Sequence, residues 1–288
     1  MKSWLPVVAM VVGACLPQAS AFTFLVRYSV MIMLFMSFLG VVPRWDLLRV
    51  SHLWLLIANV LVAVTGYLVV SLWSTEYALL AFLTGIMPTA AVAPVIAGLL
   101  SAPVGYVTLA LLLSNVGMAL AIPFLLPLLG IEGVGLTTAE LVGPVMITVM
   151  MPMLLSQAIR VWLPSLKTWF LRGSELTFWL FISNVVIAMA KASDYLQHES
   201  NASLLELLWV ALIVVAITTS NFGLGYFLEK KGFRQASSIA LGRKNTMFGV
   251  WVAVTFLPAS AALGPIAYVI THNLWHSLLI GRKNPDAA

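Results

Sequence analysis

Two adjacent cations, Arg243 and Lys244, lie inside the otherwise apolar segment 238–249. A charged side chain at membrane depth costs roughly 2.5–3.5 kcal/mol on insertion scales, so it is retained where it faces a cavity, a counter-charge or a substrate path. Gly242 and Gly249 flank the pair, which favours an interrupted helix with free backbone groups. Such groups are tolerated in a membrane only where they line a cavity or are covered by protein. This segment therefore predicts the crossing point of a secondary transporter.

The chain as a whole is too apolar for a soluble protein. Of its 288 residues, 61% are hydrophobic and 9% are charged, whereas about a quarter of the residues of a soluble domain are charged. Apolar stretches of about 20 residues recur along the sequence, and its length allows roughly ten membrane spans. We expect an all-α polytopic membrane protein that forms a single transmembrane unit over residues 1–288.

The distribution of cations predicts the orientation of this unit. The expected spans are 4–16, 23–42, 53–73, 77–100, 104–129, 141–163, 174–195, 204–227, 232–256 and 264–280. Most cations fall at the two ends and in the loops after the second, sixth and eighth spans: Lys2, Arg44, Arg49, Arg160, Lys167, Arg172, Lys230, Lys231, Arg234, Arg282 and Lys283. The opposite loops hold only two cations, Arg27 and Lys191, together with the acidic residues Glu76, Glu132, Glu140, Asp194, Glu199 and Glu206. By the positive-inside rule both termini are cytoplasmic, and a bacterial inner membrane is the expected location.

The first apolar segment has a second interpretation. Lys2, the following apolar run and the segment 19–21 (Ala-Ser-Ala) resemble a cleavable signal peptide, and 12–15 (Val-Gly-Ala-Cys) resembles a lipoprotein processing site. Removal would leave nine spans with the same loop charges. An ordinary first span explains the same residues and completes two halves of five spans, so we expect it to be retained.

Two interrupted spans occupy corresponding positions in these halves. Pro88 and Pro94 interrupt the fourth span, because each proline removes a backbone donor and clashes with the preceding turn. Gly242 and Gly249 mark the break in the ninth. With five spans in each half, the second repeat is inverted relative to the first, and paired interrupted spans indicate the binding site. We expect the fourth and ninth spans to cross near the middle of the membrane.

Segments 87–127, 242–245 and 265–273 resemble the bile acid:sodium symporter family, over nearly the whole chain. The resemblance implies a panel domain of spans 1, 2, 6 and 7 and a core domain of spans 3–5 and 8–10. It also implies alternating access by movement of one domain against the other, coupled to sodium. Of the family's ninth-span motif, the glycine and the asparagine are retained, as Gly242 and Asn245.

Other positions depart from the family pattern. The family's sodium-binding Glu falls on Ala240 and its Gln on Lys244, while a Ser-Asn pair of the fourth span falls on Ala93 and Pro94. Sodium requires several oxygen ligands, usually with a carboxylate, and every acidic residue here falls in a loop or at a span end. We therefore expect transport of a small organic anion without sodium, with Lys244 as a fixed ammonium near the position of the ion.

The remaining candidates surround this crossing. A Gln that the family has in its third span falls on Asn59. Ser114 and Asn115 in the fifth span lie close to the positions where the family places hydroxyl ligands. The predicted substrate-binding set is Lys244, Arg243, Asn245, Thr89, Ser114, Asn115, Asn59, His272 and Asn273. His272 and His276 are one helical turn apart, but no third ligand is evident, so packing explains them better than a metal site.

No phosphate loop, nucleophile elbow or zinc pattern is present, so the sequence favours neither an enzyme nor a cofactor. The expected partners are an organic anion and the lipid bilayer, without nucleic acid, and the oligomeric state is left open. Two alternatives remain: a sodium-coupled organic anion symporter, and a non-transporting receptor or scaffold that retains the fold.

Overall fold

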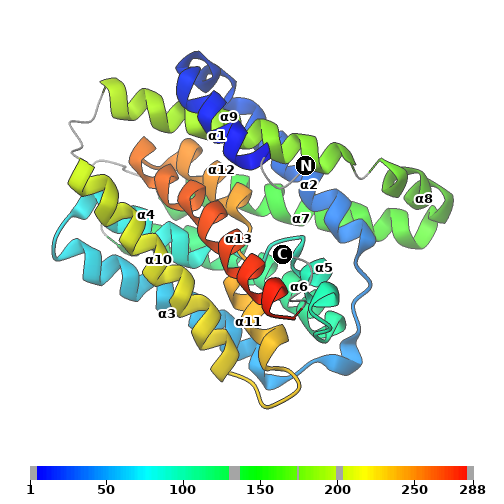
Figure 1. The fold of residues 1–288 in the computed structure, drawn as a ribbon. Coiled ribbons are helices and arrows are strands. Elements are labelled where there is room, and N and C mark those ends of the chain that lie inside the picture. The colour runs from blue at the N-terminus through cyan, green and yellow to red at the C-terminus, as the bar shows by residue number, and fades with distance from the viewer. Residues whose placement is uncertain (1–4, 130–136, 174, 199–203, 284–288) are drawn as a thin grey trace. The chain divides into compact units, whose positions relative to one another are not determined.

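The computed structural model describes residues 5–129, 137–173, 175–198 and 204–283, except for the side chains of 76, 204 and 276–283. Every regular element in these ranges is a helix (Figure 1). Five stretches are long and apolar enough to cross a membrane: α3 (Val50–Ser71), α6 (Val104–Leu128), α7 (Thr138–Trp162), α9 (Glu175–His198) and Leu205–Phe227 in α10. The chain is therefore a helical integral membrane protein.

Each predicted span contains a helix or a pair of half-helices. The continuous ones include α1 (Leu5–Cys15), α2 (Phe24–Gly40), α10 (Leu204–Phe227) and α13 (Leu263–Lys283). The fourth predicted span is divided into α4 (Thr75–Ile86) and α5 (Ala93–Leu99), and the ninth into α11 (Arg234–Gly242) and α12 (Thr246–Phe256). The helix positions are thus confirmed, while the number of membrane crossings stays a prediction.

The exact breaks differ from the prediction at two residues. Pro94 lies in the first turn of α5, where a missing N–H has no cost because the first N–H groups of a helix have no intrahelical acceptor. Gly249 lies inside α12, because a single glycine costs a helix only about 1 kcal/mol. Neither residue interrupts its helix. The breaks are shorter, at 87–92 and 243–245.

Four short elements were not predicted: η1 (Pro17–Phe22), η2 (Trp45–Leu47), α8 (Pro164–Arg172) and η3 (Ala259–Ala262). The loop residues Lys2, Glu132 and Glu199, which contribute to the predicted orientation, lie outside the described residues.

The chain divides into two compact units made of interleaved segments. The first unit comprises Met1–Val41, Ala119–Ser203 and Met247–Ile266. Within it α1 packs along α9, and α2 packs against α7 and α8 (Figure 1). Arg27 Nε of α2 donates to Thr148 Oγ1 of α7 at 3.1 Å.

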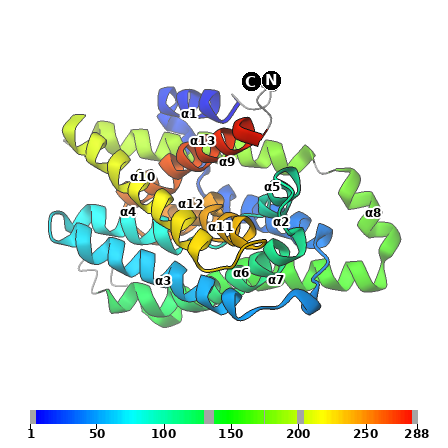
Figure 2. The same cartoon turned by 60° about the horizontal axis from the view of Figure 1, so that its bottom comes forward.

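The second unit comprises Val42–Met118, Leu204–Thr246 and Ala267–Ala288. Within it α3 packs against α4, and α10 lies against α11, α3 and α4 (Figure 2). A Cβ added to Gly85 would lie 2.6 Å from the Cα of Ala63, so glycine is required where the last turn of α4 meets α3. Both helix breaks lie in this unit. The division into a panel and a core domain stays a prediction.

Candidate functional site

The two helix breaks contact each other through their backbones. The N–H of Ala90 donates to the carbonyl of Arg243, and the N–H of Asn245 donates to the carbonyl of Pro88, both at 2.7 Å. These bonds make an isolated antiparallel bridge between Thr89 and Lys244. The predicted proximity of the two interruptions is confirmed.

Side chains and backbone groups satisfy the carbonyl ends of the half-helices. The last four carbonyls of a helix have no intrahelical partner, and leaving one unpaired in a membrane costs several kcal/mol. At the end of α4, Asn59 Nδ2 donates to the carbonyls of Ile86 and Met87 at 3.3 and 3.2 Å. At the end of α11, the Thr89 hydroxyl donates to the carbonyl of Ala240 at 2.7 Å, and the Tyr268 hydroxyl donates to that of Gly242 at 2.8 Å.

Lys244 completes this arrangement with a positive charge. The residue is 1% exposed, and its Nζ donates to the carbonyl of Gly85 at 2.9 Å and to Oδ1 of Asn59. A cation at a helix C-terminus interacts favourably with the negative end of the helix dipole. The ammonium thus lies on two protein oxygens, one from the last turn of α4 and one from the Asn59 side chain of α3. The structure gives the lysine a structural contact; its predicted contact with a substrate stays a prediction.

Arg243 is directed away from Lys244. Its backbone is extended, with φ −86° and ψ 93°, and successive side chains of an extended segment point to opposite sides. Arg243 is half-buried and its Nη1 donates to Asn273 Oδ1 of α13 at 2.7 Å. Its Nε is buried without a hydrogen-bond partner among the described residues. The two predicted cations therefore occupy different surroundings.

The other predicted residues lie around the first break. Ser114 Oγ accepts from the N–H of Thr89 at 3.0 Å, and Asn115 Nδ2 donates to the carbonyls of Thr89 and Leu111 at 3.1 and 2.8 Å. Both α6 side chains thus fix the backbone at Thr89.

Besides Asn273, the candidate residues on α13 are His272 and His276. His272 is buried and its ring packs edge-on against Tyr268, with centroids 5.4 Å apart. This contact agrees with the interpretation of His272 as a packing residue. The side chain of His276 lies outside the described residues.

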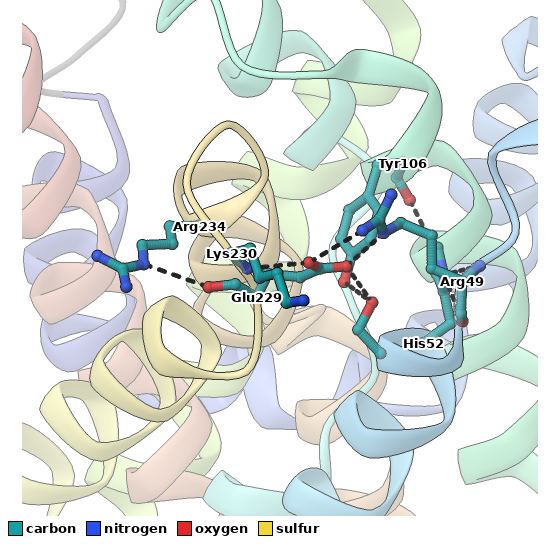
Figure 3. Close-up of polar contacts among 7 residues, drawn as sticks. Arg49, His52, Tyr106, Glu229, Lys230 and Arg234 are labelled. Atoms are coloured by element: carbon teal, nitrogen blue, oxygen red, sulfur yellow. Dashed lines mark hydrogen bonds and ion pairs between the residues drawn. The ribbon is translucent and has the colours of Figure 1, made fainter.

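A polar cluster that was not predicted connects the α10–α11 loop to the start of α3 (Figure 3). The Glu229 carboxylate, in a residue 7% exposed, accepts from Arg49 Nε and from Ser51 Oγ, each at 2.6 Å. The backbone N–H of Lys230 donates to its second oxygen at 3.0 Å. Ser51 is also hydrogen-bonded to the Tyr106 hydroxyl at 2.9 Å.

The pKa of Glu229 reflects this environment. Burial acts to raise the pKa, but the hydrogen bonds from Ser51, Lys230 and Arg49 and the charge of Arg49 outweigh burial and lower it. Beside Lys230 and Lys231, Glu229 looks in the sequence like an exposed loop acid. Its partner Arg49 is 180 positions away, so no local pattern reveals the pair.

His52 lies between this cluster and Lys244. Its ring packs on Tyr106 with centroids 4.2 Å apart, and it is 2% exposed. In the sequence, the available signal was a lone histidine directly before the third predicted span.

Compared with known proteins, the chain matches no protein family model and no curated protein.

Proposed function

We propose that this chain is a secondary transporter of a small organic anion that works by alternating access without sodium. The contact of two interrupted helices, with Lys244 bonded to the end of α4, is the observation that carries the proposal. Interrupted helices that meet and leave charged or polar groups at their ends are typical of transporter binding sites. The resemblance to the bile acid:sodium symporter family supports the same function, and belongs to the proposal.

The proposed architecture has ten membrane spans in two inverted repeats of five, with a panel and a core domain and both termini cytoplasmic in a bacterial inner membrane. Each interrupted helix then belongs to one repeat, and the crossing lies near the middle of the membrane. The positions of the helices support this arrangement because each predicted span contains one.

The absence of sodium coupling is inferred from the contacts of Lys244. A hard cation needs oxygen ligands and usually a carboxylate. Here an ammonium already binds Gly85 O and Asn59 Oδ1, and among the described residues no carboxylate forms an ion pair with it. A second cation at these oxygens would be repelled by the first.

The anion is proposed to contact Arg243. Its guanidinium is fixed by Asn273 through Nη1, and the edge formed by Nε and Nη2 has the fork geometry that binds a carboxylate with two hydrogen bonds. Lys244, being 1% exposed, acts through the backbone of the crossing.

The test is counterflow of labelled organic carboxylates in proteoliposomes, in sodium and in choline buffer. Wild-type transport should be equal in both. Arg243→Gln should weaken the affinity by about 1.5–3 kcal/mol, the range for a hydrogen bond to a charged group. Arg234→Gln is the matched control, because Arg234 Nε donates to the Glu229 carbonyl in a loop.

Two results would contradict this function. A sodium-dependent gain in affinity of tenfold or more would indicate a sodium symporter. Folded protein that moves no anion from a broad panel of carboxylates would indicate a receptor or scaffold instead.

A further inference from the structure

The loop after α10 carries three exposed cations beside the apolar end of that helix. The apolar stretch of α10 ends at Phe227, a residue that is 78% exposed. Aromatic side chains at the end of a span are enriched at the level of the lipid headgroups. Lys230, Lys231 and Arg234 follow shortly after Phe227 and are all exposed. These cations therefore lie at the depth where the phosphate groups of lipids are found.

A tight turn gathers the three cations. The N–H of Phe233 donates to the carbonyl of Lys230 at 3.0 Å, and Gly232 adopts a φ of +100°, a conformation that glycine reaches without steric cost. The positive-inside rule explains why cations occur in such a loop, but it does not require them to share one turn. The turn concentrates their positive charge at one point of the surface.

No carboxylate of the described residues pairs with these cations. Glu229 directly precedes them in the chain, but its buried carboxylate binds the side chains of Arg49 and Ser51. Its contact with the turn is the hydrogen bond from the backbone N–H of Lys230. The ion pairs in the described part of the chain do not include Lys230, Lys231 or Arg234. The positive charge of the turn is thus available to an external anion.

Arg234 is held in place by its neighbours. Its Nε donates to the carbonyl of Glu229 at 3.2 Å, and its guanidinium carbon lies 5.4 Å from the centroid of the Tyr226 ring. Figure 3 shows this guanidinium pointing away from the pair of Arg49 and Glu229. The two Nη groups remain as a planar fork, which matches two oxygens of a phosphate group.

Apolar side chains beside the turn favour a lipid over a free phosphate ion. Leu224 and Phe227 are three positions apart on α10, so they share one face, and they are 43% and 78% exposed. This face leads along the helix to the cations. An acyl chain would be stabilised by contact with it, whereas a free phosphate ion would gain nothing there.

We propose that Lys230, Lys231 and Arg234 form a binding site for the headgroup of an anionic phospholipid, whose acyl chain lies along Leu224 and Phe227. Arg234 binds the phosphate through its Nη fork, and the lysines add point charges. The site lies at the start of the nine-residue helix α11, about 13 Å along the helix axis from the crossing. It is therefore independent of the transport function proposed above.

The test measures lipid binding to the purified full-length protein in neutral detergent by native mass spectrometry. Phosphatidylglycerol is compared with phosphatidylcholine, which has the same acyl chains and no net charge. Wild type should bind phosphatidylglycerol roughly tenfold more tightly or better, because each basic residue near an anionic headgroup adds to the attraction. The triple variant Lys230→Gln, Lys231→Gln and Arg234→Gln should lose this preference.

The matched control is a second triple variant, Arg44→Gln, Lys167→Gln and Arg172→Gln. It removes the same number of positive charges from other loops, and should keep the preference for phosphatidylglycerol. Two single variants test the geometry. Arg234→Lys retains the charge but loses the fork, and should weaken binding of phosphatidylglycerol severalfold. Phe227→Ala should weaken it as well, because the acyl chain loses an apolar contact.

Size-exclusion chromatography checks the folding of each variant, and Arg234→Lys keeps the test valid if the first triple variant fails to fold. Equal binding of the two lipids by wild type would overturn the inference, and so would an equal loss in the control triple variant. Inorganic phosphate is titrated separately. If it displaces phosphatidylglycerol at comparable concentrations, the turn binds a free anion and the lipid site is refuted.

Discussion

Glu229 is a buried loop carboxylate whose charge is stabilised by Ser51, Lys230 and Arg49. A hydrogen bond to a charged group contributes about 1.5–3 kcal/mol, and exposure of Arg49 reduces that value. Glu229→Gln should therefore lower the free energy of unfolding by about 1–2 kcal/mol near neutral pH. Thermal unfolding of the purified protein measures the loss.

The pH dependence of this loss follows from the lowered pKa of Glu229. A carboxyl group whose pKa is lower in the folded state stabilises the protein above its unfolded pKa of about 4.3, and the contribution is lost as pH falls through the folded pKa. The difference in Tm between wild type and Glu229→Gln should thus be constant from pH 7 to 5.5 and shrink below about pH 4.3. Asp46→Asn, in an exposed pair with Arg44, is the control with little effect at any pH. A difference that grows in acid would contradict the assigned role.

Sequence reasoning at this scale found Lys244 and Arg243 but not their separate surroundings. Both are unusual because they are charged in an apolar segment, and composition shows that. The local extended backbone then directs one side chain toward Asn59 and the other toward Asn273. That backbone depends on a pairing between Lys244 and Thr89, which lies 155 positions earlier (244 minus 89). No short sequence pattern contains such a pairing.

At the scale of elements, the close approach of α11 to α10 depends on Gly242. A Cβ there would lie 2.2 Å from Cδ1 of Phe222. This phenylalanine is buried and stacks on Trp275, with ring centroids 5.0 Å apart, so it has no room to move. Gly242→Ala should destabilise the protein by about 1–3 kcal/mol, as overpacking of a core does.

Gly223→Ala in α10 is the matched control. A Cβ at Gly223 would meet no atom within 4 Å, and alanine favours a helix by about 1 kcal/mol over glycine. Thermal unfolding should show a lower Tm for the first variant and an equal or higher one for the second. Equal behaviour of the two would argue against tight packing at the end of α11.

The elements differ in how well the sequence predicts them. The long apolar stretches of the sequence predicted the positions of the long helices correctly, because hydropathy and length are enough for that assignment. Pro88 correctly marked a break, whereas Pro94 and Gly249 did not, because proline at a helix start and one glycine inside a helix are both tolerated. The helix α8 was missed because it has only nine residues and mixes apolar residues with polar and charged ones. It is therefore too short and too polar to resemble a span.

At the scale of the whole molecule, the distribution of charge predicts which loops face the cytoplasm. The helix α10 joins the loop that contains Lys231 to the end of α9, where His198 lies. The two residues should therefore lie on opposite sides of the membrane. With Cys15 replaced by Ala, Lys231→Cys and His198→Cys can each be tested with a membrane-impermeant maleimide on intact cells. His198→Cys should be labelled and Lys231→Cys should be labelled only after lysis. The reverse pattern would invert the proposed topology.

The bridge between the two helix breaks also constrains the order in which the protein can be completed during synthesis. The carbonyl of Pro88 accepts from the N–H of Asn245, and Gly85 O accepts from Lys244. Ribosomes add about 5–20 residues per second, so these groups emerge roughly 8–30 s before their partners exist. During that interval Asn59 and Ser114, which are translated early, can already hold part of the first break. The remaining carbonyls must stay in contact with water, the insertion machinery or a chaperone until the C-terminal part of the chain arrives.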